Sequence, residues 1–144
     1  MNSERWKKVK ELFEEAENAE GKEQQKLFDQ IKKELETHTR IEETIFYPAV
    51  QEHEELKDMV LESLEEHKQV KTLLKEMDAL ASDSDKFEPK LKVLMENVEH
   101  HAEEEEEGKM FPKLRELMDE QQLEELGAEL EAAKNNSQKR RKAS

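Results

Sequence analysis

The apolar residues of this chain recur at intervals of three and four along most of its length, a spacing that predicts amphipathic α-helices. Only three glycines and three prolines interrupt the 144 residues, so we expect few turns and long helices. Strand-forming residues are sparse and do not alternate with polar ones. A chain of this length can bury one core without disulfides. We therefore predict a single all-α domain built as a helical bundle.

The periodicity places four long helices and a short fifth one. Gly21 ends the first helix, and the polar turn at residues 82–85 separates the third from the fourth. Residues 134–144 are polar and basic, and they are typical of a disordered tail. We therefore predict a helical domain over residues 1–133 with a tail over 134–144. The predicted helices cover residues 3–19, 22–51, 54–81, 87–118 and 120–133.

Composition narrows the possible partners. The formal net charge of −14 would repel phosphates, so we expect neither a nucleic acid nor an anionic membrane surface as partner. The chain has no cysteine, which excludes thiolate metal ligands and thiol catalysis and is compatible with a reducing compartment. The first residues lack an apolar signal segment, and no stretch is apolar and long enough to span a bilayer. We expect a soluble, cytoplasmic protein.

Histidines and glutamates occupy positions where leucines are expected on three of the predicted helices. At about 100° per residue, His38 and Glu42 fall inside the apolar stripe of the second helix. His67 falls inside the stripe of the third helix, and His101 lies on the apolar face of the fourth. Burying an unpaired carboxylate is costly, and a cation would compensate for it. Imidazole and carboxylate ligands without sulfur favour Fe, Mn or Zn, so we predict a metal site inside the bundle.

The fourth helix offers two candidates for a further carboxylate ligand. Glu105, four residues after His101, lies on the stripe of an ideal α-helix, but Met110 and Leu114 then drift off the stripe by roughly 100°. One extra residue wound into the helix, a π-bulge, restores their phase and brings Glu106 onto the face in place of Glu105. Such bulges often occur at functional sites. We therefore prefer Glu106 to Glu105 as the ligand.

An internal repeat supports the same choice. Residues 42–48 and 106–112 each contain two glutamates, two variable residues, two bulky apolar residues and a proline. Glu42 and Glu106 each stand six residues before the proline of their block. The second and fourth helices should therefore present related surfaces, and each proline should kink its helix near the end.

The two remaining histidines do not fit the pattern. His53 stands among glutamates near a helix end, and we expect it on the surface. His100 points away from the apolar stripe of its helix. We therefore leave both out of the predicted ligand set.

The sequence resembles the hemerythrin-like HHE cation-binding domains over residues 5–120. The resemblance rests on residues 36–43 (ETHTRIEE), 65–67 (EEH) and 99–101 (EHH), with the glutamate run and Met-Phe-Pro that follow. It implies an up-down antiparallel four-helix bundle, here with a short extra C-terminal helix, around a non-haem di-iron site that can carry an oxo or hydroxo bridge. It also implies three histidines as terminal ligands and two glutamates as bridges between the irons. The implied metal ligands are His38, Glu42, His67, His101 and Glu106.

The chain departs from the family pattern at two places. Trp6 stands where the family usually has a histidine on the first helix, and an indole nitrogen is a hydrogen-bond donor, not a metal ligand. Three consequences are open: a weakened second metal, water as a replacement ligand, or a single-metal site. His67 has Ser63 and Lys71 four residues to either side, so the two-histidine motif of oxygen-carrying hemerythrins is absent. We expect Trp6 to pack in the bundle, and the metal count, one or two, stays open.

The ligand set favours a binding protein over an enzyme. We expect it to hold non-haem iron and to bind O2 or another diatomic reversibly, or to sense iron or redox state. Two alternatives are a di-iron enzyme acting on peroxide or nitric oxide, and a bundle with a degenerate, single-metal or metal-free site. The sequence has no substrate-pocket signature and no general acid beyond the ligands, which favours binding. It names no protein partner and no oligomeric state.

Overall fold

The computed structural model describes residues 2–80 and 84–143, which form helices joined by short turns, with no strand in these ranges. Inside the helices the side chains of residues 2–6, 104–107 and 137–143 are not among those described. Two segments, η1 and η3, are π-helical, and η2 is a single 3₁₀ turn. The elements in chain order are α1 (Asn2–Glu17), α2 (Gly21–Ile41), η1 (Glu42–Phe46), α3 (Tyr47–Gln51), η2 (Glu54–Leu56), α4 (Lys57–Asp78), α5 (Phe87–Glu99), η3 (His100–Met110), α6 (Phe111–Leu117) and α7 (Glu120–Ala143).

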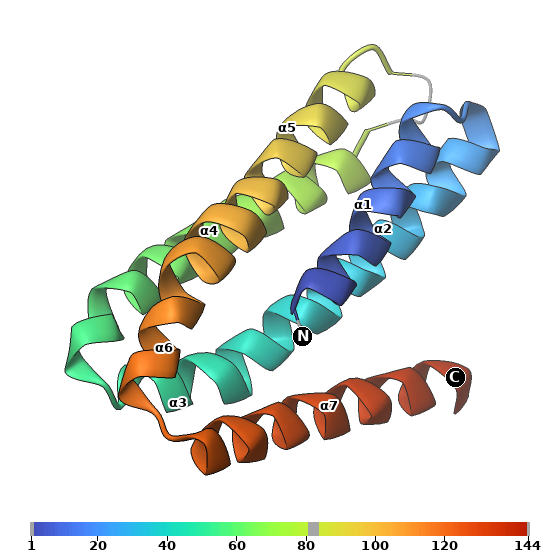
Figure 1. The fold of residues 1–144 in the computed structure, drawn as a ribbon. Helices are drawn as coiled ribbons and strands as arrows, with labels where there is room; N and C mark the ends of the chain where they lie inside the picture. Colours follow the sequence, from blue (N-terminus) through green and yellow to red (C-terminus); the bar gives the residue numbers. More distant parts are fainter. Residues whose placement is uncertain (1, 81–83, 144) are drawn as a thin grey trace.

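The long helices are arranged in two pairs (Figure 1). Helix α1 packs along α2, α4 packs along α5, and α1 also contacts α5. Helix α7 lies on the outside of these pairs, against α2 and η1. The prediction of an all-helical protein is therefore confirmed. Among the described residues, no helix is both long enough and apolar enough to cross a bilayer.

The turns follow from residues that the sequence places between the helices. Gly21, the first residue of α2, has a φ of 57°, a left-handed conformation that glycine adopts without steric cost. The turn before α5 is described from Ser84 onward, where the Ser84 hydroxyl accepts a hydrogen bond from the backbone N–H of Lys86 at 3.2 Å. Both helix boundaries therefore lie close to where the sequence predicts them.

Two hydrophobic clusters stabilise the fold. The first joins α1, α2, α4 and α5, and at its centre the rings of Phe28 and Phe87 meet edge to face with centroids 5.4 Å apart. The second joins the end of α2, η1, α3, η2, the start of α4, the end of η3, α6 and α7, and it includes Tyr47, Met110 and Leu126. Three buried polar residues, described below, lie where the two clusters meet. The apolar packing on both sides fixes the positions of these polar side chains.

The last helix is longer than the sequence pattern predicts. Helix α7 continues to Ala143, whereas the pattern places its end at residue 133 and a disordered tail beyond it. Residues 134–143 contain no glycine or proline, and their basic side chains favour the negative end of the helix dipole. The helical backbone therefore extends through most of the segment predicted as a tail. The division of the chain at residue 133 remains a prediction.

Candidate metal centre

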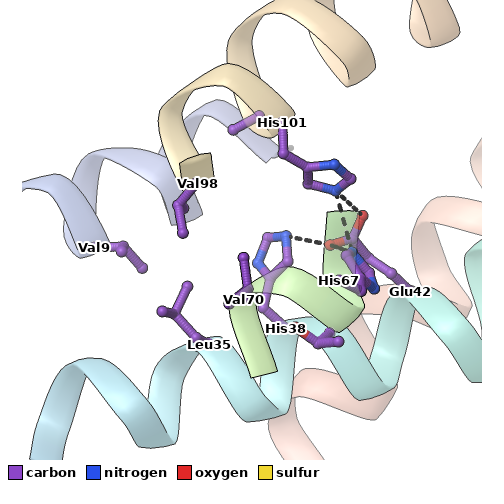
Figure 2. A pocket seen from close by; sticks show the side chains of 10 residues that line it. Val9, Leu35, His38, Glu42, His67, Val70, Val98 and His101 are labelled. Atoms are coloured by element: carbon purple, nitrogen blue, oxygen red, sulfur yellow. Dashed lines mark hydrogen bonds and ion pairs between the residues drawn. The ribbon is translucent and has the colours of Figure 1, made fainter. Parts of the chain in front are cut away.

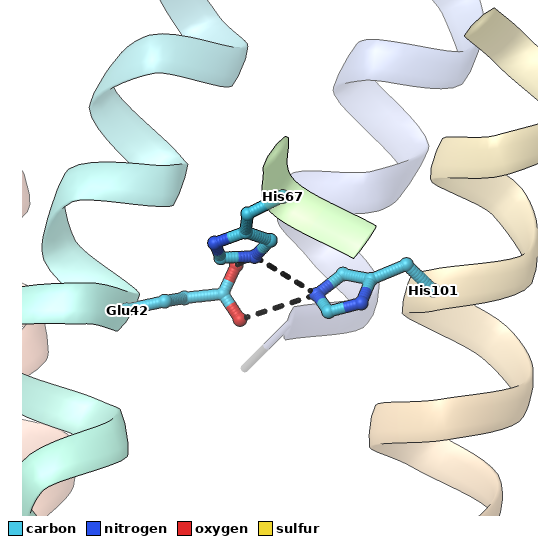
Figure 3. Close-up of side chains that lie close together, drawn as sticks. All are labelled: Glu42, His67 and His101. Carbon is cyan, nitrogen blue, oxygen red and sulfur yellow. Dashed lines mark hydrogen bonds and ion pairs between the residues drawn. The ribbon is translucent and has the colours of Figure 1, made fainter. Parts of the chain in front are cut away.

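Three buried side chains from three separate elements converge inside the protein (Figure 3). Glu42 is the first residue of η1, His67 lies in the middle of α4, and His101 is the second residue of η3. One carboxylate oxygen and one ring nitrogen from each histidine all lie within 4.8 Å of one another. The structure thus brings together three of the five residues that the sequence predicts as metal ligands.

The two imidazole rings are oriented by carboxylates on their outer sides. His67 Nδ1 lies 3.2 Å from an oxygen of Glu43, and His101 Nδ1 lies 2.9 Å from an oxygen of Glu66. An ionised carboxylate can only accept a hydrogen bond, so each Nδ1 carries the proton and each Nε2 presents its lone pair inward. The two Nε2 atoms are 3.1 Å apart, and each is 3.7 Å from an oxygen of Glu42. This arrangement of inward lone pairs is the one that metal-binding histidines need.

Burial, against the pull of the nearby carboxylates, favours the neutral form of His67. Burial lowers the pKa of His67, and the nearby charge of Glu42 does not fully offset this effect. Burial alone would raise the pKa of Glu43, but hydrogen bonds from Lys71 and His67 hold it below its usual value. Lys71 Nζ donates to both Glu43 oxygens, at 3.1 and 2.9 Å. Lys71 therefore helps to keep Glu43 ionised, and Glu43 in turn accepts the hydrogen bond from His67 Nδ1 that orients the ring.

Both blocks of the internal repeat contain a π-helical segment. The predicted bulge after His101 is confirmed, because η3 spans His100–Met110 and the side chains of Met110 and Leu114 are buried. A second π segment, η1, follows His38 and was not predicted. In each block the proline is among the first residues of the α-helix that follows the π-helical segment. The prolines therefore mark the return from π-helix to α-helix, and the kink expected at each of them stays a prediction.

Tyr47 is a member of the site that the sequence analysis did not identify. Its hydroxyl lies 3.0 Å from Glu42 Oε2, 3.2 Å from His67 Nε2 and 3.1 Å from His101 Nε2. In an uninterrupted α-helix Tyr47 would lie about 140° from Glu42. The backbone N–H of Tyr47 donates to the carbonyl of Glu42, the five-residue hydrogen bond of a π turn, and this turn brings both side chains to one face. The repeat was the available signal, since a bulge near Glu106 implies one near Glu42.

The other predicted ligands are placed differently. His38 Nε2 contacts Glu42 Oε1 at 2.8 Å, but it lies beside the three-residue cluster and its side chain is 20% exposed. The side chain of Glu106 lies outside the described residues, as do those of Glu105 and Trp6. Their predicted roles therefore stay predictions.

The two histidines left out of the ligand set lie apart from the cluster. The side chain of His100 is 49% exposed, and its Nε2 lies 3.7 Å from an oxygen of Glu66. His53 precedes η2 and is half-buried, so it is less exposed than the sequence predicts. Neither residue is in the group of ligand atoms that converge.

A small cavity adjoins the converging side chains (Figure 2). Its volume is about 40 Å³, close to that of a single small molecule. One side is polar, with three histidines and a glutamate, and the opposite side is apolar. The lining residues are Val9, Leu35, His38, Thr39, Glu42, His67, Val70, Val98, His101 and Ala102.

The donor atoms fit a metal ion. Glu42, His67 and His101 supply one carboxylate and two imidazoles, all buried, at separations that one cation can span. The Tyr47 hydroxyl carries one hydrogen, so it can donate to only one of these three acceptors at a time. A cation would interact favourably with all three at once. The same cluster is therefore a candidate metal site by geometry and by ligand chemistry.

Comparison with known proteins agrees with this geometry. The family model described as the hemerythrin HHE cation-binding domain matches residues 7–114. The chain belongs to this family. The HHE domain here is similar to the crystal structure of an HHE cation-binding domain-containing protein from Mycobacterium kansasii, with a TM-score of 0.82 and 27% identity over 94% of this chain and 83% of that one.

A longer protein also matches this HHE chain. It is a DNA nickase of Nostoc sp., 30% identical over 134 residues. The match covers 92% of the present chain but only 38% of the nickase. The chain thus spans well under half the length of that curated relative.

Proposed function

We propose that this HHE protein binds non-haem iron and uses it to bind O2 or another diatomic, or to sense iron or redox state. The observation that carries the proposal is the convergence of Glu42, His67 and His101, whose ligand atoms lie within 4.8 Å of one another in a buried site. Imidazole with carboxylate is a ligand set suited to iron. Iron, when bound, supplies a redox-active centre with coordination positions open to small ligands.

The proposed ligand set follows the family pattern. His38, His67 and His101 act as terminal ligands, and Glu42 and Glu106 act as bridges where two irons are present. The contact between His38 and Glu42 supports a place for His38 at the edge of the centre. An up-down antiparallel four-helix bundle is the arrangement in which these elements would surround the metal. Trp6 stands where the family usually has a histidine. Metal analysis must therefore determine whether the chain binds one iron or two.

The cavity beside the site supports a diatomic ligand. At about 40 Å³ it can hold one small molecule, and its polar side consists of the proposed ligands. Val9, Val70 and Val98 line its apolar side. A pocket of this size and lining would admit O2, which supports the binding of a diatomic ligand.

Iron loading under reducing conditions tests the proposal. Purified protein is incubated with ferrous iron without oxygen, desalted, analysed for metal and then exposed to oxygen. We expect bound iron and an oxygen-dependent near-ultraviolet band. His101→Leu should lose both, whereas His53→Leu, which changes a histidine outside the cluster, should keep both. A parent protein that holds no iron and gives no band would refute the proposal.

Further measurements distinguish the proposed binding function from two other activities. Steady-state consumption of peroxide or nitric oxide would indicate a di-iron enzyme, whereas a reaction limited to the amount of bound iron would favour a binding protein. Nicking of DNA belongs to the longer relative, and the net charge of −14 leads us to expect no nucleic-acid partner here. The absence of cysteine is compatible with the cytoplasmic location that we include in the proposal.

A further inference from the structure

We infer that Tyr47 is a ligand of the bound iron, coordinating ferric iron through its phenolate oxygen. The inference rests on the proposed function and extends it, because it adds an oxygen donor to the ligands expected for the family. It predicts a spectroscopic property that iron bound only by histidine and glutamate does not have.

The position of the Tyr47 hydroxyl is the main evidence. Within 3.2 Å of this oxygen lie one atom each of Glu42, His67 and His101, the three side chains whose ligand atoms converge. The oxygen is therefore surrounded by the proposed ligands rather than placed behind them. A cation bound by any two of these side chains would lie next to the phenol.

The phenol is also held firmly in this place. Tyr47 is 1% exposed, and its ring packs against Phe46 and against the imidazole of His67, with centroids 5.7 and 5.4 Å away. The π-turn hydrogen bond from its N–H to the Glu42 carbonyl fixes the backbone that carries both donors. A ligand restrained in this way loses little conformational entropy when it binds a metal.

The hydrogen count explains why a metal would replace the phenol proton. Three acceptor atoms face a hydroxyl group that has one hydrogen to donate. On iron binding the O–H bond would break, the proton would leave to solvent, and the oxygen would keep the electron pair with which Tyr47 would hold the iron. The positive charge of a tightly bound cation would stabilise the phenolate. Tyrosine is an established iron ligand in proteins.

The internal repeat makes the donor specific to one half of the site. Tyr47 corresponds to Phe111 in the second block, which carries no oxygen. The aromatic ring is thus retained in both blocks, whereas the hydroxyl is present in only one. Packing explains why both blocks have an aromatic ring at this position. It does not explain the hydroxyl of Tyr47, which we assign to metal binding.

The absorption spectrum of the ferric protein tests the inference. Phenolate bound to ferric iron gives a charge-transfer band in the visible region, and Tyr47 is the single tyrosine of the chain, so the source of such a band is unambiguous. The 144-residue chain is loaded with ferrous iron, oxidised and desalted, and its iron content is measured. We expect the visible band in the parent protein and its complete loss in Tyr47→Phe, which keeps the ring.

The iron affinity gives a second measurement. Loss of an outer-shell partner lowers metal affinity roughly 10- to 100-fold. Tyr47→Phe would remove a direct ligand, so its iron affinity should fall by at least as much. The matched control is Phe111→Leu, at the corresponding position of the second block, which should retain the band. Circular dichroism checks that both variants are folded, and the parent spectrum remains decisive if one of them is not.

The outcomes separate this inference from the proposed function. Iron bound to the parent protein without a visible band would overturn the phenolate ligand and leave iron binding intact, because Tyr47 would then only donate a hydrogen bond. A parent protein without iron would overturn both. A visible band that persists in Tyr47→Phe would also refute the assignment.

Discussion

The Nε2 atoms of His67 and His101 lie 3.1 Å apart, although the two residues are 34 positions apart in the sequence. Each ring is anchored at its other nitrogen by a carboxylate, from Glu43 or Glu66. Both Nε2 atoms therefore present lone pairs to the same small space, which is unfavourable until a proton donor or a cation shares it. Folding and metal binding should be coupled for this reason.

The first prediction concerns the stability of the metal-loaded protein. Iron at 100 times its dissociation constant should stabilise the fold by about 2.7 kcal/mol, which raises the melting temperature by about 5–10 °C for a chain of this size. Thermal unfolding with and without iron measures the shift, and a chelator should reverse it. His101→Leu should lose the gain. An equal shift in this variant would mean that iron stabilises the protein from another site.

The second prediction concerns the carboxylates behind the imidazoles. Glu66→Ala removes the acceptor that holds His101 Nδ1 at 2.9 Å, so iron affinity should fall about 10- to 100-fold. Glu65→Ala is the matched control, because Glu65 is an exposed neighbour that pairs with Lys68 on the surface. Competition with a chromogenic chelator measures both affinities. Equal affinities in the two variants would show that Glu66 does not position the ring.

The third prediction is that a cavity in the first hydrophobic cluster lowers stability without changing metal binding. Phe28→Ala leaves a cavity in the first hydrophobic cluster and should cost about 3–5 kcal/mol of unfolding free energy. Denaturant titration measures the loss, and Leu61→Ala, at a residue that is 48% exposed, should change stability by well under 1 kcal/mol. Iron content per folded chain should stay the same in both variants. Loss of iron in folded Phe28→Ala would contradict this prediction.

Local periodicity accounts for most of what the sequence predicts correctly. The apolar stripes lead to the all-helical fold and to the inward positions of Glu42, His67 and His101, because burial and helix phase are both properties of short sequence segments. The π-helix near His101 could be predicted because the stripe changed phase after it.

The rest of the site could not be predicted in the same way. Tyr47 lies on the wrong face of an ideal α-helix, and only the π turn after Glu42 brings it inward. No phase change drew attention to that turn, since few apolar residues follow it before the helix ends. The distances between the imidazoles depend on how α4 and η3 pack, which is a long-range property that one sequence does not reveal.

The fourth prediction tests the π-helix at η3. Deletion of Gly108 removes one residue from the segment and should turn Met110 and Leu114 by about 100°, out of the second hydrophobic cluster. Exposure of two large side chains should cost about 3–6 kcal/mol. Gly108→Ala is the control, because it keeps the residue count and adds a Cβ only 3.3 Å from the Glu103 carbonyl, which needs a small adjustment. Equal stability of the two variants would mean that the extra residue does not set the phase.

The fifth prediction concerns the residue that stands where the family has a histidine. Trp6 precedes Val9 by three residues in the sequence, a spacing that puts two positions on one face of an ideal α-helix, and Val9 lines the cavity beside the proposed ligands. Trp6→His would place an imidazole on that face, and we expect a higher iron content per chain than in the parent protein. Lys7→His adds a histidine to the exposed side of the same turn and should leave the content unchanged. Elemental analysis of freshly loaded protein measures all three chains. An unchanged iron content in Trp6→His would show that the tryptophan does not limit the number of bound metals. A higher iron content in Lys7→His would mean that surface histidines account for the increase.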